Sequence, residues 1–234
     1  MPNIVILTGA GVSAESGVST FRDANGLWEN HRIEDVATPE GFIKNPSMVH
    51  KFYNLRRAQL KQVKPNAAHT ALAELEQAWH KEGDFLLITQ NVDDLHERAG
   101  SQRLLHMHGE LLKIRCEFCD SIFYHETDVS TGLHCLSCGQ AGGLRPDIVW
   151  FGEHPYGMDQ AYSALEKADI FVAIGTSGQV YPAAGFVELV HQNGRSAQIL
   201  EINPNPTFES HFDQFIQEKA TKGVLKWASS LMAK

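Results

Sequence analysis

The four cysteines of this chain all lie between residues 116 and 138. Cys116 and Cys119 form one C-x-x-C pair, Cys135 and Cys138 form another, and residues 120–134 separate them. Thiolates at this spacing can close a tetrahedral zinc site, the alternative being a set of free buried thiols. Because cysteine fills every ligand position, no place remains for a catalytic water. We therefore expect one structural Zn²⁺ in a small zinc-binding module at residues 110–144.

Outside this segment, short apolar runs alternate with amphipathic segments. The runs predicted as strands are residues 3–7, 85–89, 103–106, 170–174 and 198–202. The predicted helices are 46–61, with Pro46 following an Asn45 cap, a helix capped by Asn66 and carrying Leu72, Leu75 and Trp79, and helices at 186–191 and 223–231. Residues 22–44 show no strong period and are expected to be irregular. Strands alternating with helices predict an α/β fold, a Rossmann-like doubly wound parallel sheet.

Composition and charge narrow the class of protein further. The net charge of −8 makes non-specific binding to nucleic acid a poor expectation. No run approaches the roughly 18–20 apolar residues that span a bilayer, so we expect no membrane partner. The first residues, MPNIVILTGAG, lack a basic segment and a cleavage pattern, which predicts a buried strand rather than a signal peptide. A cytoplasmic location is the resulting expectation.

A glycine turn follows the first predicted strand. Gly9-Ala10-Gly11-Val-Ser13-Ala matches G-x-G-x-x-[GA], a pattern whose backbone amides approach a pyrophosphate where a helix begins. A plain turn between strand and helix remains an alternative. The acidic residue that a dehydrogenase carries about 20 residues later is missing, so a nucleotide here would be held differently from a hydride-transfer cofactor.

Polar residues follow the other predicted strands. Gln90, Asn91 and Asp93 follow the second, residues 175–177 (Gly-Thr-Ser) follow the fourth, and Asn203 follows the fifth. The carboxyl ends of parallel strands line one crevice, where a nicotinamide or ribose could be read. Each residue could instead be a cap or turn residue. A general base could be supplied by His106 or by His108, and the residues alone do not choose between them.

These motifs together resemble the sirtuin family, in particular its bacterial class III members. The matching stretches, in the family's order, are GAGVSAESGVSTFRDANGLWE, TQNVDD, HMHGE, the two C-x-x-C pairs, VWFGE, GTS and EINP. The resemblance implies a discontinuous Rossmann-type domain over 1–109 and 145–234, with a helical insertion around 30–65. It also implies NAD as a consumed cosubstrate and acylated protein lysines as partners, giving free lysine, nicotinamide and O-acyl-ADP-ribose.

The resemblance assigns roles to individual residues. The histidine before Gly-Glu is the family's general base, which is His108 here. The implied cofactor-binding residues are Gly9, Ala10, Gly11, Ser13, Phe21, Arg22, Trp28, Gln90, Asn91, Asp93, Gly175, Thr176, Ser177, Asn203 and Ala220. The implied substrate-binding residues are Ala37, Tyr53, Arg56, Val149, Trp150, Phe151, Gly152 and Glu153.

Two of these residues concern the acyl group. Tyr53 and Arg56 resemble the Tyr-x-x-Arg pair of sirtuins that remove succinyl and malonyl groups, and Ala37 stands where that subgroup has a small residue. Positions i and i+3 share a helix face, and arginine offers a planar fork to a carboxylate. On the residues alone, Arg56 could be a solvated helix charge beside Arg57.

Three alternative functions remain open on the sequence alone. The first is a deacetylase with no real preference for acidic acyl groups. The others are a redox enzyme using NAD(H), which would share the glycine turn, and a zinc-ribbon binding module without catalysis. The missing acidic residue disfavours the redox enzyme, and the net charge together with the polar strand ends disfavours the binding module.

Overall fold

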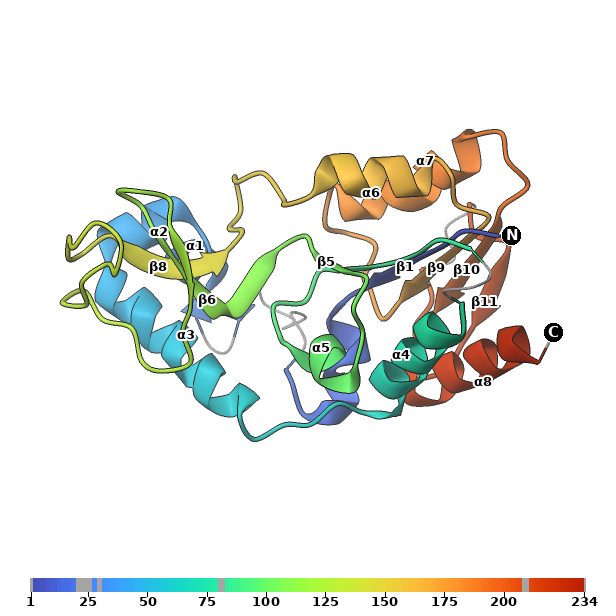
Figure 1. The fold of residues 1–234 in the computed structure, drawn as a ribbon, viewed down its shortest axis with the longest axis horizontal. Helices are drawn as coiled ribbons and strands as arrows, with labels where there is room; N and C mark the ends of the chain where they lie inside the picture. The colour runs from blue at the N-terminus through green and yellow to red at the C-terminus, as the bar shows by residue number, and fades with distance from the viewer. Residues whose placement is uncertain (1, 20–26, 29–30, 80–82, 208–210, 234) are drawn as a thin grey trace.

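A parallel sheet forms the centre of the computed structural model, which describes residues 2–19, 27–28, 31–79, 83–207 and 211–233 (Figure 1). Six strands build this sheet within those ranges, in the order β11-β10-β9-β1-β4-β5. Their bounds are β1 Ile4–Thr8, β4 Phe85–Thr89, β5 Leu104–His106, β9 Ile170–Ile174, β10 Gln198–Ile202 and β11 Gln214–Ile216. Every residue of β1, β4 and β9 is buried, as expected for apolar strands covered on both faces.

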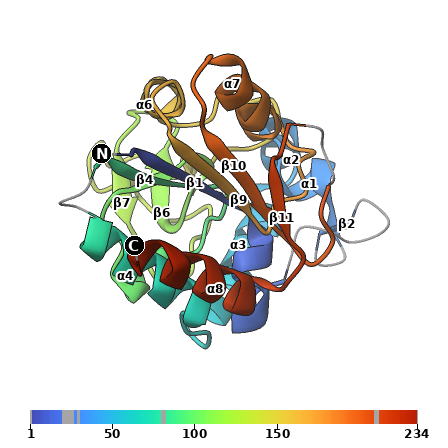
Figure 2. The ribbon, with the colours of Figure 1, turned by 90° about the vertical axis from the view of Figure 1, so that its right-hand side faces the viewer.

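Helices cover both faces of this sheet, as Figure 2 shows. On one face lie α4 (Ala67–Trp79) and α8 (Ala220–Met232), which share a core with Ile4, Ile6 and Val172. On the other lie α6 (Met158–Leu165) and α7 (Phe186–Gln192), packed on alternate strand residues such as Val5 and Phe171. The predicted doubly wound α/β fold is confirmed.

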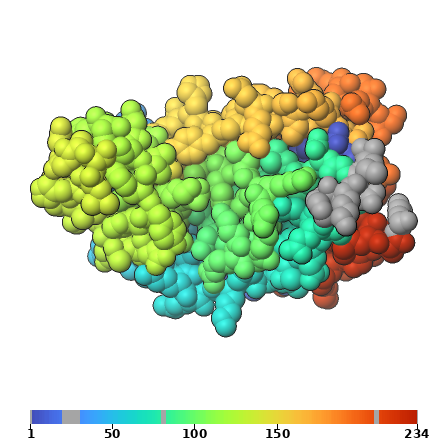
Figure 3. All heavy atoms as spheres, in the orientation of Figure 1, coloured from blue at the N-terminus to red at the C-terminus, as the bar shows by residue number. Residues whose placement is uncertain are grey.

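A second, antiparallel sheet lies at one end of the molecule, where its yellow-green atoms are visible in Figure 3. Its strands, in the order β7-β6-β8, are β6 Gly109–Cys116, β7 Ile122–Tyr124 and β8 Leu144–Ile148. Helix α3 (Pro46–Leu60) packs against this sheet, and α1 (Ile33–Val36) and α2 (Pro39–Lys44) pack on α3 in the same apolar cluster. The predicted domain boundary after residue 144 assigns residues 145–148 of β8 to the large domain, whereas this strand pairs with β6 in the small sheet.

The structure corrects two local predictions. Residues 33–36 and 39–44 are helical rather than irregular, and Thr38 caps the second helix, α2, by accepting from the Gly41 amide, with Pro39 in its first turn. The helix expected after the glycine turn is absent from the described residues there. Ala10–Val12 and Ala14–Ser16 form two 3₁₀ turns instead, the second ending at Gly17 with φ 94°.

The remaining elements are short. They are α5 (Leu95–Ala99), the two-residue strands β2 (Leu27–Trp28) and β3 (His31–Arg32), and a 3₁₀ turn at Ala183–Gly185. Within the described ranges, no helix combines the length and apolar character needed to cross a membrane.

Candidate active site

A cavity of about 610 Å³ opens where the sheet reverses its winding order. From β1 the chain builds outward to β4 and β5, then crosses over to β9, β10 and β11. Ligands of open α/β sheets bind at such a switch point, beyond the carboxyl ends of the strands. The predicted site residues that line the cavity are Gly9, Ala10, Gly11, Ala37, Tyr53, Arg56, Gln90, Asn91, Asp93, His108, Val149, Trp150, Phe151, Gly152, Glu153, Gly175, Thr176, Ser177, Asn203 and Ala220.

A few predicted residues stand outside this set. Phe21 and Arg22 lie outside the described residues, as does the side chain of Trp28, whose backbone belongs to β2. Ser13 is buried beneath the cavity wall. Sequence reasoning missed several residues that do line the cavity, among them Glu15, Gln59, Leu111, Tyr181 and Lys219.

The glycines of the turn let it lie directly against the end of β9. A Cβ on Gly11 would lie 2.7 Å from the Gly175 Cα, and one on Gly9 would lie 2.8 Å from the Gly175 oxygen. The Gly9 amide donates to Ile174 O, and the Gly11 amide donates to Gly175 O. These two amides therefore join the turn to β9 rather than point into the cavity, which differs from the pyrophosphate role expected from the pattern.

Ser13 connects the polar residues behind the cavity. Its hydroxyl donates to Asp93 Oδ2 over 2.9 Å and accepts from Asn91 Nδ2 over 3.1 Å. The Ser13 oxygen also lies 3.3 Å from His69 Nε2. Burial raises the pKa of Asp93, although bonds from the Leu95 amide and the Ser13 hydroxyl oppose that effect. Ser13 thus fixes the two side chains that face the cavity.

Two buried histidines complete this layer. His69 Nδ1 accepts from the Asn66 amide over 3.2 Å, so Nε2 carries the proton of the neutral ring and donates to Ser13. The His96 ring lies edge-on to the His69 ring, with the centroids 4.8 Å apart. Burial lowers the pKa of His69 to about 4, and it lowers that of His96 well below its ordinary value.

We expect the free energy of unfolding to fall as the pH is lowered from about 6.5 to about 4. Unfolded His69 takes up a proton near its ordinary pKa of 6.5, whereas folded His69 does so only near 4. The unfolded state therefore binds more protons in this window, and His69 alone contributes about 3 kcal/mol of lost stability across it. Urea unfolding at several pH values in this window measures how steeply the free energy of unfolding changes with pH. His69→Gln is expected to flatten this dependence, and an unchanged slope in that variant would contradict the assignment.

The two candidate bases differ in their surroundings. His108 lines the cavity, and its Nδ1 lies 3.1 Å from Gln90 O. Because a carbonyl oxygen only accepts, Nδ1 carries the proton and Nε2 keeps a lone pair. Burial lowers the pKa of His108, partly offset by the bond to Gln90, so the neutral ring persists near pH 7.

His106 is held away from the cavity lining. Its Nδ1 lies 3.2 Å from Asn91 O, and its Nε2 bonds to the Glu97 carboxylate. Burial would lower the pKa of His106, but the hydrogen bond and charge of Glu97 outweigh burial and raise it. A ring held by two acceptors in this way is suited to donating rather than to taking up a proton.

Side chains from β4, β9 and β10 meet at the far side of the cavity. Gln90 Nε2 donates to Thr176 Oγ1 over 3.0 Å, which connects the ends of β4 and β9 above β1. Asn203 Nδ2 donates to Thr176 O over 2.8 Å. The buried Glu201 carboxylate accepts from Asn203 Nδ2 and from the Thr207 amide and hydroxyl. Glu201 therefore fixes the loop that carries Asn203, a role that sequence reasoning missed.

Helix α3 brings the predicted acyl-reading pair to the other end of the same cavity. Tyr53 is fully buried, Arg56 is 8% exposed, and Ala37 lies with them in the lining. The Arg56 guanidinium carbon lies 5.7 Å from the Phe52 ring centroid. Burial raises the pKa of Tyr53 to about 12, so the hydroxyl stays protonated and can donate. The alternative that Arg56 is a solvated charge on the helix surface is wrong, because its side chain is buried.

A different face of α3 ties the helix to the small sheet. The buried Arg57 donates from Nε to Leu111 O over 2.9 Å and from Nη1 to Asn54 Oδ1 over 2.9 Å. Asn54 in turn donates to Val129 O and accepts from the Val129 amide. Sequence reasoning placed no role on either residue, yet they connect the helix carrying Tyr53 to the loop between the cysteine pairs.

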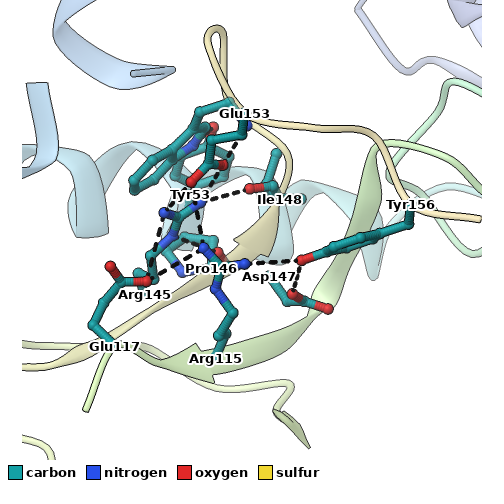
Figure 4. A network of polar contacts seen from close by, with 10 residues as sticks. Tyr53, Arg115, Glu117, Arg145, Pro146, Asp147, Ile148, Glu153 and Tyr156 are labelled. Carbon is teal, nitrogen blue, oxygen red and sulfur yellow. Dashed lines mark hydrogen bonds and ion pairs between the residues drawn. The ribbon is translucent and has the colours of Figure 1, made fainter. Parts of the chain in front are cut away.

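The loop after β8 borders the cavity between these two ends. Its amides are bonded within the chain: Val149 N donates to His108 O, Phe151 N to Ala37 O, and Trp150 N to Glu153 Oε2. Any pairing with a substrate strand must therefore use other backbone groups of the loop. Figure 4 shows the Glu153 carboxylate turned toward Arg145, at 2.7 and 2.8 Å.

The four cysteines come together as predicted. Their sulfur atoms lie within 4.8 Å of one another, with Cys116 and Cys138 at 3.8 Å and Cys119 and Cys135 at 3.7 Å. Zinc–sulfur bonds of about 2.3 Å place tetrahedral sulfurs about 3.8 Å apart. The cluster therefore fits one structural zinc ion held by four thiolates.

The fold and the cavity define a Rossmann-like nucleotide-binding protein that carries a four-cysteine zinc module. Residues 9–182 match the Sir2 family, and the chain belongs to that family, which confirms the sirtuin prediction. It is 58% identical to an NAD-dependent protein deacylase of Bdellovibrio bacteriovorus, over 90% of each chain. It is 53% identical to the NAD-dependent protein deacylase of Vibrio parahaemolyticus, over 99% of this chain and 95% of the relative.

Solved structures show the same likeness. A Sir2 homologue bound to ADP-ribose aligns with a TM-score of 0.88 and 41% identity, over 99% of this chain and 94% of that one. A complex of a Sir2 homologue with NAD aligns with a TM-score of 0.86 and 40% identity, over 98% and 90%. None of these relatives is named as a redox enzyme or as a zinc-ribbon binding module.

Proposed function

We infer that the chain is an NAD-dependent protein deacylase that takes acylated lysine side chains of proteins as substrates. One observation carries this inference: a single cavity is lined by the predicted dinucleotide residues, by His108 and by the predicted acyl-lysine residues. Proteins with more than half of their residues identical to this chain carry that activity in their names. NAD is the consumed cosubstrate, and the four thiolates hold one zinc ion away from the cavity.

Within this proposal, His108 is the general base. NAD would supply the ribose carbon that accepts the acyl oxygen, with nicotinamide as the leaving group. The Nε2 lone pair of His108 takes a proton from a ribose hydroxyl, and Gln90 O keeps the ring in the required tautomer. Asn91 and Asp93, fixed by Ser13, hold the nicotinamide ribose and carboxamide.

The finer proposal is a preference for acidic acyl groups such as succinyl and malonyl, alongside acetyl. Arg56 brings a positive charge to the buried wall of the cavity, and a terminal carboxylate is the complementary group for a guanidinium. The Arg56 guanidinium can donate two parallel hydrogen bonds to that carboxylate, with the Tyr53 hydroxyl as a further donor. Ala37, with its small side chain, leaves room for the longer acyl chain.

The Arg56→Met variant tests this preference. We expect kcat/KM on a succinyl-lysine peptide to fall 10- to 100-fold, roughly the value of a charged hydrogen bond, and to fall much less on the matched acetyl-lysine peptide. Nicotinamide release with the two peptides is the measurement. Lys51→Met removes an exposed cation from the same helix and is the matched control. Equal losses on both peptides in Arg56→Met would remove the carboxylate-reading role.

A further inference from the structure

A buried arginine behind the cavity wall organises the residues that face the substrate. Arg145 lies on β8, is 1% exposed and does not line the cavity itself. Its guanidinium makes a two-pronged contact with Glu153, at 2.7 and 2.8 Å, and donates to Ile148 O over 2.8 Å (Figure 4). Such paired contacts fix the plane of the guanidinium group.

That plane lies against Trp150. The Arg145 guanidinium carbon is 3.5 Å from the Trp150 ring centroid, which is a close stacking distance. The indole Nε1 of Trp150 then donates to the Tyr53 hydroxyl oxygen over 2.9 Å. Arg145 is thereby connected to Tyr53 through one aromatic ring.

The direction of this last bond has a chemical consequence. An indole N–H can only donate, so the Tyr53 oxygen is the acceptor and its hydroxyl hydrogen is directed away from Trp150. Tyr53 lines the cavity beside Arg56, where the acyl carboxylate is proposed to lie. The hydrogen that Tyr53 can offer to a carboxylate is thus set by the position of Trp150.

We propose that Arg145 is a positioning residue for acyl selectivity, which holds Trp150 so that Tyr53 presents its hydroxyl hydrogen to an acidic acyl group. The proposal rests on the acyl preference proposed above. Arg145 acts through Trp150 and does not itself contact the substrate. Glu153 fixes the plane of the Arg145 guanidinium through its two hydrogen bonds.

A neighbouring arginine provides a matched control. Arg115 belongs to the same charged cluster, with Nη2 at 3.3 Å from Glu153 and Nη1 at 3.2 Å from the Tyr156 hydroxyl. The structure gives a ring contact with Trp150 for Arg145 and, among the described residues, none for Arg115. Replacing Arg115 therefore perturbs the ion pairs but leaves the stacking partner of Trp150 in place.

The experiment compares Arg145→Lys with Arg115→Lys, each keeping its charge but losing the planar fork. We expect Arg145→Lys to lower the succinyl-to-acetyl ratio of kcat/KM roughly tenfold, mainly through the KM of the succinyl peptide. Arg115→Lys is expected to change the ratio by less than about twofold. In a Tyr53→Phe background, Arg145→Lys should change the ratio no further, because the hydroxyl on which it acts is gone.

The indole N–H resonance of Trp150 gives a readout that does not depend on substrate. Four tryptophans are present, and Trp150→Phe identifies the signal by its disappearance. We expect the resonance to shift in Arg145→Lys and in Tyr53→Phe, and to stay in place in Arg115→Lys. If Arg145→Lys fails to fold, Glu153→Gln replaces it and should shift the resonance in the same direction.

The outcomes separate the two proposals. A resonance that does not move in Arg145→Lys, or a selectivity loss that persists in the Tyr53→Phe background, overturns the positioning role. An equal loss of kcat/KM on both peptides also overturns it, since a merely structural role predicts that result. A wild-type enzyme without preference for the succinyl peptide contradicts the proposed acyl preference, and the indole resonance alone then decides whether Arg145 positions Tyr53.

Discussion

Replacing His108 by alanine is expected to lower kcat by about 10²- to 10⁴-fold while NAD binding persists. The imidazole is the cavity-lining group whose Nε2 has a lone pair, since Nδ1 is committed to Gln90 O. Its loss removes the proton acceptor for the ribose hydroxyl but leaves Asn91, Asp93 and the glycine turn in place. Nicotinamide release measures turnover, and isothermal titration with NAD measures binding.

The neighbouring histidine is the control for this experiment. His106→Gln removes an imidazole two residues away that does not line the cavity and that holds Asn91 O and Glu97. We expect its turnover to fall much less than that of His108→Ala, because it alters the support of Asn91 and not the base itself. Near-normal turnover in His108→Ala, or an equal loss in His106→Gln, would reject the assignment of His108 as the base.

The choice between these histidines shows what residues alone could not determine. His106 is the last residue of β5, His108 follows two residues later, and each donates through Nδ1 to a backbone carbonyl of the Gln90–Asn91 segment. What separates them is the Glu97 carboxylate on α5, which fixes His106 and raises its pKa. The contact between Glu97 and His106 arises from tertiary packing and cannot be read from the sequence. Before the structure was known, only the family resemblance could therefore favour His108 over His106 as the general base.

The strands were predictable because their physical signal is local. The runs at residues 85–88 and 170–174 are apolar, and they lie in β4 (Phe85–Thr89) and β9 (Ile170–Ile174), which are buried on both faces and have the predicted bounds. Helix α3 begins where expected because Asn45 accepts from the Met48 amide in its first turn. The 3₁₀ turns after Gly9 were not predictable, since they depend on close contact with Gly175, which follows β9 and is distant in sequence.

The buried arginines mark the limit of reasoning from residue type. Arginine is usually solvated, yet Arg57 and Arg145 are each 1% exposed. Burial of Arg57 is compensated by its hydrogen bonds to Leu111 O and Asn54 Oδ1. Burial of Arg145 is compensated by its ion pair with Glu153, which lies on the loop after β8. No pattern along the chain marks these partners. The residues that support the site were therefore missed, although most residues that face the cavity were named.

Removing one zinc ligand is expected to destabilise the small module by several kcal/mol, because binding free energy of a structural zinc ion is folding free energy. Cys138 is the most informative ligand to replace, since it is exposed and serine there costs no core packing. The apolar cluster of this module is small: Ile114, Cys116, Val129, Cys135 and Leu144 are buried in it, and Cys119, Phe123 and Leu133 pack against it partly buried. A cluster of that size cannot hold the loop without the metal.

The Cys138→Ser variant is expected to contain well below one equivalent of zinc and to unfold at a lower temperature than the wild type. Elemental analysis measures the first quantity, and thermal unfolding measures the second. Ser137→Ala changes the adjacent exposed residue without removing a sulfur, so it should match the wild type in both. The loss should extend to α3, because Asn54 holds the Val129 backbone of this loop. A variant that keeps a full zinc equivalent and an unchanged midpoint would show that the four sulfurs do not act as one metal site.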